Sequence, residues 1–365
     1  MKDKKFLLTR SYILLLLTTL FQISCQPSES KTSESQKSEV VNTDLKKSIT
    51  CFVYHRFGNE KYPSTNIDLQ TFEQHLTYLK EHDFMVLTLR EAVDYLKDET
   101  PSQKVAVLTV DDGYKTFKTG ALPLLKKYDF KATLFVNTET VGGSSYLNWD
   151  DLKEISNSGI EIGNHTHSHA YFLNYEEAIR YKNFESDVMK AQNLFQKHLN
   201  VKPVTFAYPY GEYDEAMKKT VKEIGFEAAV AQNSGVMNSQ ADFYAIPRFP
   251  MASSYAELKN FTEKVNMQTI FLSDANNAEH VVSDNPPKMS LSFDKANYQL
   301  KNLQCFIQGG SCDLNVNDQD SIVTVSIKSK SSLKRRRTLY TITVPDQDGK
   351  WHWISHLWVI PSIKE

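Results

Sequence analysis

The stretch Val105-Ala-Val-Leu-Thr-Val-Asp-Asp-Gly113 decides the fold class of this chain. Its first six residues are apolar or small, and they predict a β-strand. Two carboxylates and a glycine follow, and the glycine lets the backbone turn sharply where the strand ends. Parallel βα architectures place their active sites at this end of their strands. Asp-Asp-Gly is also an ordinary turn sequence, so the stretch indicates chemistry only with support from the rest of the chain.

Strands and helices alternate on both sides of this stretch, from Ser48 to about Leu272. The predicted strands are Ile49–Tyr54, Val105–Val110, Ala132–Val136 and Ile160–Ile162. The predicted helices are Leu69–His82, Leu89–Lys97, Lys115–Tyr128, Tyr175–Leu199 and Tyr213–Ile224. Such an alternation predicts parallel βαβ units that close into a barrel or form an open sheet.

The pattern changes after about Ser273. Residues 273–288 contain paired asparagines and Asn285-Pro286-Pro287, which predict a linker. Beyond the linker, apolar and polar residues alternate without intervening helices in Ser321–Ile327, Thr338–Val344 and Trp351–Trp358. We therefore predict a small β-sandwich-like accessory domain over residues 289–365.

The N-terminus predicts export from the cytoplasm. In residues 2–10, four basic side chains and one acidic one give a net charge of +3, and an apolar run from Tyr12 to Phe21 follows. This run is about half as long as a membrane-spanning helix, so residues 1–24 predict a signal peptide. Gln22-Ile-Ser-Cys25 resembles the lipobox of bacterial lipoproteins, in which Cys25 is lipidated; the alternative is an ordinary secretory signal. Residues 25–47 are rich in Ser, Glu, Lys and Thr, and they predict a flexible tether.

Composition narrows the classes of function. The 42 Lys+Arg and 44 Asp+Glu residues nearly balance, which argues against a dedicated nucleic-acid binder. Four cysteines are too few for a disulfide scaffold. Cys305 and Cys312 can pair in an oxidising compartment, whereas Cys51 lies in an apolar run and predicts a buried, inert thiol.

Two further stretches strengthen the indication of a site. Gly163-Asn-His-Thr-His-Ser-His169 follows a predicted strand, and His165 and His169 share one face if this segment forms a helical turn. These two side chains can then bind one metal while His167 points elsewhere. A solvated polar loop is the alternative. Phe206-Ala-Tyr-Pro-Tyr-Gly211 is an aromatic loop that, by itself, is explained better by packing around a proline turn than by a role in a site.

Together and in this order, the three stretches resemble the motifs of the polysaccharide deacetylases, carbohydrate esterase family four. Thr109–Gly113 matches the first motif with Val110 in place of Phe, His165–His169 matches the second, and only Pro209-Tyr210 matches the third. Phe52–Arg56, Tyr146–Asp150 and the aromatic loop are similar to the branch that de-N-acetylates poly-N-acetylglucosamine. The resemblance covers residues 48–272 and implies a distorted (β/α) barrel.

The resemblance implies a role for individual residues. Asp112, His165 and His169 are expected to bind a divalent metal, most often Zn²⁺, with Co²⁺, Ni²⁺ or Mn²⁺ as alternatives. Asp111 is expected to be the general base, and the backbone N–H of Tyr210 to help hold the oxyanion. Trp149, Tyr208 and Pro209 are the expected substrate contacts.

Two parts of the family pattern are absent. Many members carry an arginine in the third motif that orients the base, where this chain has Ala207. Arg248 is a candidate substitute, and a surface arginine is the alternative. The late Leu-x-His motif that supplies the general acid is missing, because no histidine lies between His198 and His280. His55, just beyond the first strand, is our candidate for the acid.

We therefore predict an exported, lipid-anchored, metal-dependent deacetylase of a poly-N-acetylglucosamine-like polysaccharide, monomeric and in the bacterial cell envelope. Alternatives are a peptidoglycan or chitooligosaccharide deacetylase, an amidase for a small non-sugar amide, and a catalytically inactive glycan-binding lipoprotein. In the accessory domain, Trp351 and Trp353 share a strand face and either stack on sugars or belong to the sandwich core. Basic residues between Lys328 and Arg337 either meet an anionic surface or form a solvated turn.

Overall fold

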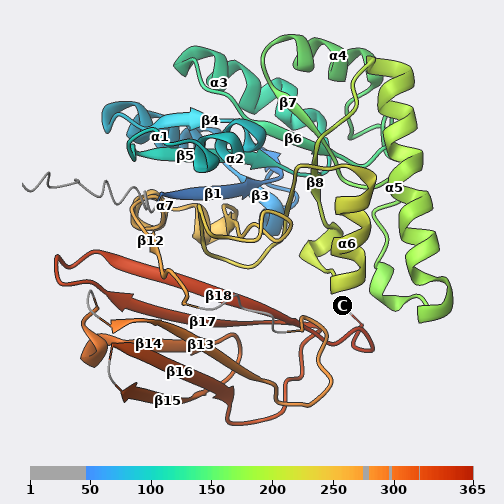
Figure 1. The fold of residues 1–365 in the computed structure, drawn as a ribbon. Coiled ribbons are helices and arrows are strands. Elements are labelled where there is room, and N and C mark those ends of the chain that lie inside the picture. Colours follow the sequence, from blue (N-terminus) through green and yellow to red (C-terminus); the bar gives the residue numbers. More distant parts are fainter. Residues whose placement is uncertain (1–46, 274–278, 296–297, 320, 365) are drawn as a thin grey trace, which may run out of the picture. The chain divides into compact units, whose positions relative to one another are not determined.

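A computed structural model describes residues 47–273, 279–295, 298–319 and 321–364 (Figure 1). The predicted signal peptide, the lipidation site Cys25 and all of the predicted tether except Lys47 lie outside these residues. Lys47 is not part of a tether: it is fully buried, and its ammonium group donates to the carbonyl oxygens of Tyr95 at 2.7 Å and Asp98 at 2.9 Å. None of the helices in the described ranges is long and apolar enough to cross a bilayer.

Within the described residues, nine strands form one sheet, and β5 lies near its centre. The order is β10-β1-β5-β6-β7-β8-β9, with β4 paired to β5 and β11 paired to β1. All the pairings are parallel except that of β10 with β1. The strands are β1 Ser48–Tyr54, β4 Met85–Leu87, β5 Val105–Val110, β6 Thr133–Val136, β7 Glu161–Asn164, β8 Thr205–Ala207, β9 Ala228–Val230, β10 Val236–Asn238 and β11 Phe249–Pro250.

Helices connect these strands, as the alternation predicts. They are α1 Leu69–Glu81, α2 Leu89–Lys97, α3 Leu122–Tyr128, α4 Trp149–Asn157, α5 Glu177–Leu199, α6 Glu215–Ile224 and α7 Leu258–Val265. Asp68, Thr88, Asn148 and Asp214 cap four of them by accepting a backbone N–H of the first turn. The predicted helix Lys115–Tyr128 is instead a π-helical turn, Phe117–Ala121, followed by α3. We did not predict α4 and α7.

The sheet curls into a distorted barrel, which confirms the predicted fold class (Figure 1). An irregular segment, residues 246–250, connects its two sides. Ile246 exchanges backbone hydrogen bonds with Ala229 and Ala231 beside β9, and Phe249 pairs with Phe52 of β1. This segment brings Arg248 between the two sides, over the end of β5.

Residues beyond the barrel form two further sheets. One has the order β12-β18-β17-β14 and the other β13-β16-β15. Side chains from both sheets, such as Leu291, Val325 and Ile342, share one buried core, so the predicted sandwich is confirmed. The strands are β12 Gln268–Thr269, β13 Lys288–Asp294, β14 Gln304–Ile307, β15 Cys312–Gln319, β16 Ile322–Ser329, β17 Arg337–Pro345 and β18 Trp351–Val359.

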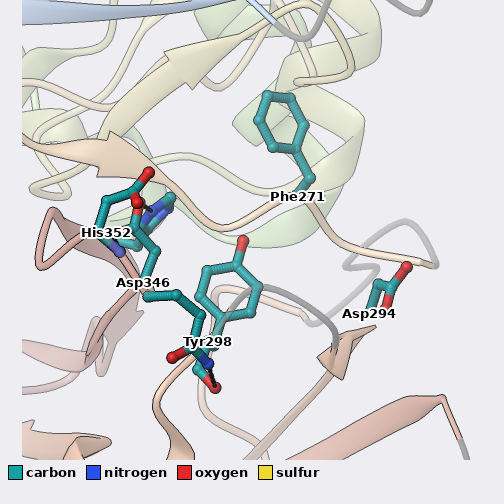
Figure 2. Close-up of a pocket in the computed structure, with 7 residues that line it drawn as sticks. Phe271, Asp294, Tyr298, Asp346 and His352 are labelled. Carbon is teal, nitrogen blue, oxygen red and sulfur yellow. Dashed lines mark hydrogen bonds and ion pairs between the residues drawn. The ribbon is translucent and has the colours of Figure 1, made fainter.

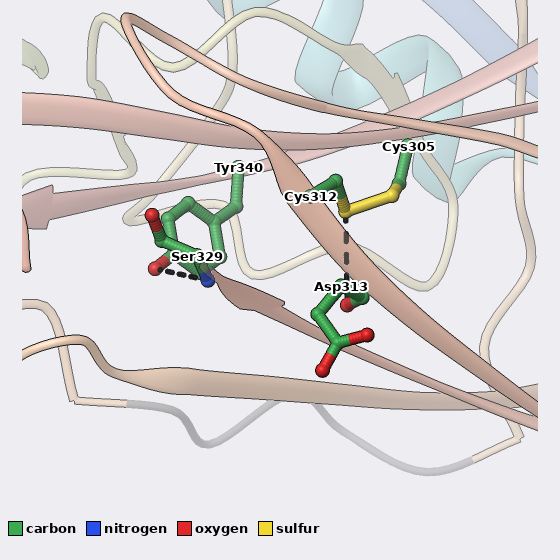
Figure 3. The surroundings of a disulfide bond; sticks show 5 residues. All are labelled: Cys305, Cys312, Asp313, Ser329 and Tyr340. Atoms are coloured by element: carbon green, nitrogen blue, oxygen red, sulfur yellow. Dashed lines mark hydrogen bonds between the residues drawn. A yellow bond between two sulfur atoms is a disulfide. The ribbon is translucent and has the colours of Figure 1, made fainter. Parts of the chain in front are cut away.

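The three described cysteines behave as the sequence indicated. Cys305 on β14 and Cys312 on β15 form a disulfide with Cα atoms 6.2 Å apart, which links the two sheets of the sandwich (Figure 3). Cys51 on β1 is free and buried, and burial raises its thiol pKa to about 12. The Cys51 thiol is therefore uncharged and unreactive at neutral pH.

Candidate metal and catalytic site

The two carboxylates at the end of β5 point in different directions because the backbone turns between them. Asp111 still pairs with β1, donating its N–H to Tyr54 O at 2.9 Å. Asp112 and Gly113 then adopt left-handed conformations, with φ angles of 74° and 69°. Asp111 is completely buried, whereas the Asp112 side chain is 16% exposed and faces the histidine motif. One short turn thus supplies two carboxylates with separate environments.

Asp112, His165 and His169 form a group whose ligand atoms lie within 4.8 Å of one another. The two Nε2 atoms are 3.1 Å apart, and Asp112 Oδ1 lies 3.5 Å from His165 Nε2 and 3.6 Å from His169 Nε2. Neighbouring ligands of a tetrahedral metal with bonds of about 2.0–2.1 Å are separated by about 3.4 Å. The three side chains therefore fit a small divalent cation of the Zn²⁺ class.

The surrounding backbone fixes both histidines. His165 follows β7 directly, and its Nδ1–H donates to Ala207 O at 2.7 Å, which leaves Nε2 as the free donor atom for a cation. His169 donates its backbone N–H to Thr166 Oγ1 at 3.0 Å. The expected helical turn is wrong in detail, since Thr166 and His169 have φ angles of 67° and 52° and the segment is a bend. His167 points away, as predicted, and bonds Thr138 Oγ1 through Nδ1 at 2.8 Å.

The charge states of Asp112 and His169 suit metal binding, whereas the pKa of His165 is raised: burial lowers it, but the interaction with Asp112 and the charges of Asp111 and Asp112 outweigh this effect. Burial alone would raise the pKa of Asp112, but its interaction with His165 and the charges of His55, His165 and His169 hold this pKa far below its usual range. Burial lowers the pKa of His169 to about 4. An ionised carboxylate and a neutral imidazole are the forms that ligate a metal.

Asp111 is held by Arg248 in a bidentate pair. The two guanidinium nitrogens donate to the two carboxylate oxygens at 2.7 and 2.8 Å, and both side chains are completely buried. Arg248 is fixed in turn, because its Nε donates to Ala231 O at 2.8 Å. Burial tends to raise the pKa of Asp111, but Arg248, His165 and His55 lower it below the usual range. Asp111 is thus an ionised carboxylate beside the metal group, and Arg248 is not a surface residue.

His55 lies in the short gap between β1 and β2, Arg56–Phe57, and is partly exposed. It is close enough to contribute electrostatically to the lowered pKa values of both Asp111 and Asp112, after the larger effects named above. The structure therefore places our candidate acid at the same end of the barrel as the metal group. Its chemical role is a prediction.

The third motif forms a 3₁₀ turn, Pro209–Gly211, after β8. Tyr210 has a φ of 59°, and its ring packs edge-to-face on His169 at 4.5 Å and stacks on Tyr171 at 3.7 Å. This contact places the turn beside the metal group. Tyr208 is completely buried and donates its hydroxyl to Tyr244 O at 3.1 Å, and Pro209 is buried as well. Our expectation that Tyr208 and Pro209 contact a polysaccharide is therefore wrong, because neither ring is accessible.

The ring contacts of Trp149 are with helix α5 and not with the metal group. It begins α4, and its ring stacks on His198 at 4.4 Å and meets Phe195 edge-to-face at 6.0 Å. Both partners belong to α5. Trp149 therefore joins two helices, and these contacts do not support the predicted substrate role.

Two arginines that the sequence did not assign to the site reach it from the accessory domain. Arg336 pairs with Glu212 through two contacts of 2.7 Å, and both side chains are almost completely buried. Arg337, at the start of β17, donates to Tyr210 O at 3.0 Å. We expected the basic residues of this segment either to meet an anionic surface or to form a solvated turn. Arg336 and Arg337 do neither, because both contact the barrel. The accessory domain instead holds the third motif.

A separate cavity of about 260 Å³ lies in the accessory domain, and none of the described candidate residues lines it. Figure 2 shows His352, Asp346, Tyr298, Phe271 and Asp294 around it. His352 is engaged through both ring nitrogens, with Thr269 O at 2.6 Å and Asp346 Oδ2 at 3.2 Å. We interpret this cluster as structural.

Comparisons with known proteins relate this part of the chain to one family. Residues 98–229 match the family model of the polysaccharide deacetylases, a range that holds the metal group and Asp111 but not His55, Arg248 or the accessory domain. The poly-beta-1,6-N-acetyl-D-glucosamine N-deacetylase of Staphylococcus aureus is 28% identical over 207 residues, covering 54% of this chain and 71% of the relative.

Two solved structures share the fold. The deacetylase PplD of Streptococcus pyogenes, in complex with acetate, superimposes with a TM-score of 0.55 at 22% identity, over 60% of this chain and 98% of that one. IcaB from Ammonifex degensii gives a TM-score of 0.52 at 24% identity, over 60% of this chain and 97% of that one. Residues 98–229 therefore form a polysaccharide deacetylase domain, the domain of a family of hydrolases that cleave amide bonds.

Proposed function

We propose that the protein removes N-acetyl groups from a poly-N-acetylglucosamine-like polysaccharide outside the cytoplasm, with a divalent metal held by Asp112, His165 and His169. The observation that carries this proposal is the arrangement of the three ligands beside a buried, ionised Asp111. The similarity to the Staphylococcus aureus enzyme supports the choice of polysaccharide. The predicted lipobox at Cys25 supports an anchor in the cell envelope.

The three ligand side chains would hold a Lewis acid for the reaction. When bound, the cation provides a Lewis acid for the acetamide carbonyl and for the attacking water. His165 Nε2, His169 Nε2 and Asp112 Oδ1 would hold it. Three protein ligands leave open positions for water and substrate, as catalytic zinc sites require.

Asp111 is the proton acceptor for the attacking water. Arg248 donates one hydrogen bond to each carboxylate oxygen of Asp111. A carboxylate has about four lone-pair sites, so each oxygen keeps a lone pair that can accept a proton. Because Arg248 lowers the pKa of Asp111 against the effect of burial, the carboxylate is ionised near neutral pH and ready to act.

Tyr210 and His55 complete the reaction in this proposal. The backbone N–H of Tyr210 stabilises the negative charge that develops on the acetamide oxygen, an effect typically of about 3 kcal/mol. His55 donates a proton to the nitrogen of the leaving sugar as the C–N bond breaks. Water supplies the hydroxyl of the product, so the reaction yields acetate and a free amine.

The proposal is tested by acetate release from three polymers: poly-N-acetylglucosamine, chitooligomers and peptidoglycan. We expect the mature protein to release acetate from the first, to lose this activity with a chelator and to regain it with Zn²⁺. His169→Ala should lose bound metal, measured by mass spectrometry, while His167→Ala, a matched histidine outside the ligand group, should retain it.

Each other outcome changes the proposal. If the protein prefers chitooligomers or peptidoglycan, that polymer is the substrate instead of poly-N-acetylglucosamine. If acetate release continues in the presence of a chelator, the reaction does not depend on a metal. Absence of release from all three polymers would leave a glycan-binding module.

A further inference from the structure

We propose that a groove between the barrel and the accessory domain binds additional sugar units of the same polysaccharide strand, outside the catalytic site. This inference rests on the proposed function. The groove, called the aromatic groove below, is lined by Tyr255, Phe306, Trp351, Trp353, Lys264 and Thr341 among others.

The aromatic groove consists of two adjoining cavities of about 470 and 540 Å³. Phe306 and Trp353 line both of them, so the two cavities share a wall. The first extends to Met251 and Tyr255 of the barrel, and the second extends to Trp351 of the accessory domain. Neither contains a residue of the metal group.

Exposed aromatic side chains concentrate in this groove. Tyr255 is 64% exposed, Phe306 50% and Trp351 37%. In the described ranges five aromatic side chains are exposed, and these three are the majority of them. An aromatic ring that is exposed to water lacks the stabilisation that burial would give it. Several such rings in one concave surface therefore indicate a binding site.

The other lining groups match the chemistry of an uncharged sugar. A pyranose ring has an apolar C–H face, which stacks on aromatic rings, and hydroxyl groups around its edge. Neutral amides that can bond such hydroxyls line the same two cavities: Asn260, Asn266, Gln304 and Gln308. Trp353 is anchored, because its Nε1–H donates to Ser234 O at 3.0 Å and Lys264 Nζ lies 4.1 Å from its ring centroid.

Strand β17 connects the third motif with the groove. Arg337 contacts Tyr210, and Leu339, Thr341 and Thr343 follow on the same face of the strand, where they line the two cavities. At about 3.3 Å per residue, Thr343 lies about 20 Å from Arg337. On the barrel side, Phe249–Met251 line the groove directly after Arg248. A polysaccharide held at the metal site can therefore extend into the groove. For this reason we propose that the groove binds the same polysaccharide chain.

The test compares a long and a short substrate with the full mature protein. We expect Phe306→Ala combined with Trp351→Ala to raise KM for poly-N-acetylglucosamine about tenfold, from the typical strength of aromatic stacking. The same variant should lose clearly less on the N-acetylglucosamine trimer, which is too short to span both sites. Phe306→Tyr combined with Trp351→Phe keeps the rings and should retain most of the affinity for the polymer.

Tyr175→Ala is the matched control, since Tyr175 is 38% exposed and lies outside the groove. Equal losses on polymer and trimer, or an unchanged KM for the polymer, would overturn the proposal and leave the groove to another partner. The wild-type protein tests the proposed function separately: if it releases no acetate from either substrate, the proposed function fails, whatever the groove variants do.

Discussion

At the scale of single residues, the site depends on how two adjacent aspartates are separated. The left-handed turn at Asp112 sends one carboxylate to the histidines and leaves the other on Arg248. A buried carboxylate without Arg248 would have a raised pKa and would be protonated more easily. Arg248 therefore sets the charge of the proposed base, and it arrives from a segment 137 residues later in the chain.

His55 is the proposed general acid, and its removal tests that role. His55→Ala should lower turnover about 10²- to 10⁴-fold, the usual contribution of a general acid. Metal content should not change, because His55 is not one of the three ligands. Acetate release and metal analysis on the same preparation measure the two effects.

The control is His82→Ala, which removes an exposed histidine at the end of α1. Wild-type turnover in His55→Ala would show that another group protonates the leaving amine. Loss of metal together with turnover would assign His55 to the ligand group instead.

At the scale of elements, local sequence patterns predicted most of the barrel. Apolar runs identified β1, β5, β6 and β7, and the segments between them identified α1 and α2. Asp112, His165 and His169 lie close together because parallel strands bring their carboxyl ends to one side of the sheet. The His165–His169 bend was mispredicted, since left-handed residues at Thr166 and His169 replace the helical turn.

Long-range contacts could not be predicted from these patterns. The bidentate fit of Arg248 to Asp111 depends on an irregular barrel closure that no periodicity marks. Arg336 and Arg337 follow Arg335 in a basic run that looks solvated, yet their partners Glu212 and Tyr210 lie more than 120 residues earlier. The resemblance implied that Tyr208 contacts the substrate, but a sequence motif does not tell which side chains of a loop are buried.

At the start of β17, Arg337 supports the turn that carries Tyr210. Arg337→Ala should lower kcat about tenfold while KM and metal content change little, because the Tyr210 turn loses its partner next to His169. This magnitude corresponds to about 1.4 kcal/mol in the transition state. Arg337→Lys keeps a donor for Tyr210 O and should recover part of kcat.

Arg335→Ala is the matched neighbour, and we expect wild-type kinetics from it. If Arg337→Ala only lowers the unfolding temperature and leaves kcat intact, the arginine supports the fold rather than the turn. Arg336 is unsuitable for this test, since its removal would leave Glu212 buried and unpaired, at a cost of about 3–5 kcal/mol.

At the scale of the whole molecule, barrel and accessory domain behave as one packed structure. β12, which follows the last barrel helix, pairs in parallel with β18 of the accessory domain. Leu357 and Val359 of β18 pack in the same core as Phe206 and Tyr213 of the barrel. Together with the Arg336–Glu212 pair, these contacts make the accessory domain part of the catalytic structure.

Two buried histidines lie where these parts meet, and they make stability depend on pH. His356 on β18 stacks on His280 at 4.4 Å, and His280 packs on Tyr213 of the barrel at 4.2 Å. Burial, and then the charge of His280, lower the pKa of His356 to about 3. Burial also lowers the pKa of His280. In the unfolded chain a histidine has a pKa of about 6.5.

Because the folded pKa lies below the unfolded one, the unfolded state binds more protons between these two values. The neutral histidines therefore give their full contribution above pH 6.5, and stability is lost as the pH falls from 6.5 toward 3. For His356 alone, the loss between pH 8 and pH 5 is about 2 kcal/mol of unfolding free energy. Denaturant unfolding at these two pH values measures it.

His356→Asn should reduce this difference by about 2 kcal/mol, because it removes one titrating group whatever it does to stability at pH 8. His82→Asn, which changes an exposed histidine, should leave the difference as it is in the wild-type protein. If His356→Asn has the same pH dependence as the wild type, His356 binds protons equally in the folded and the unfolded state, and the junction between barrel and accessory domain tolerates its charge.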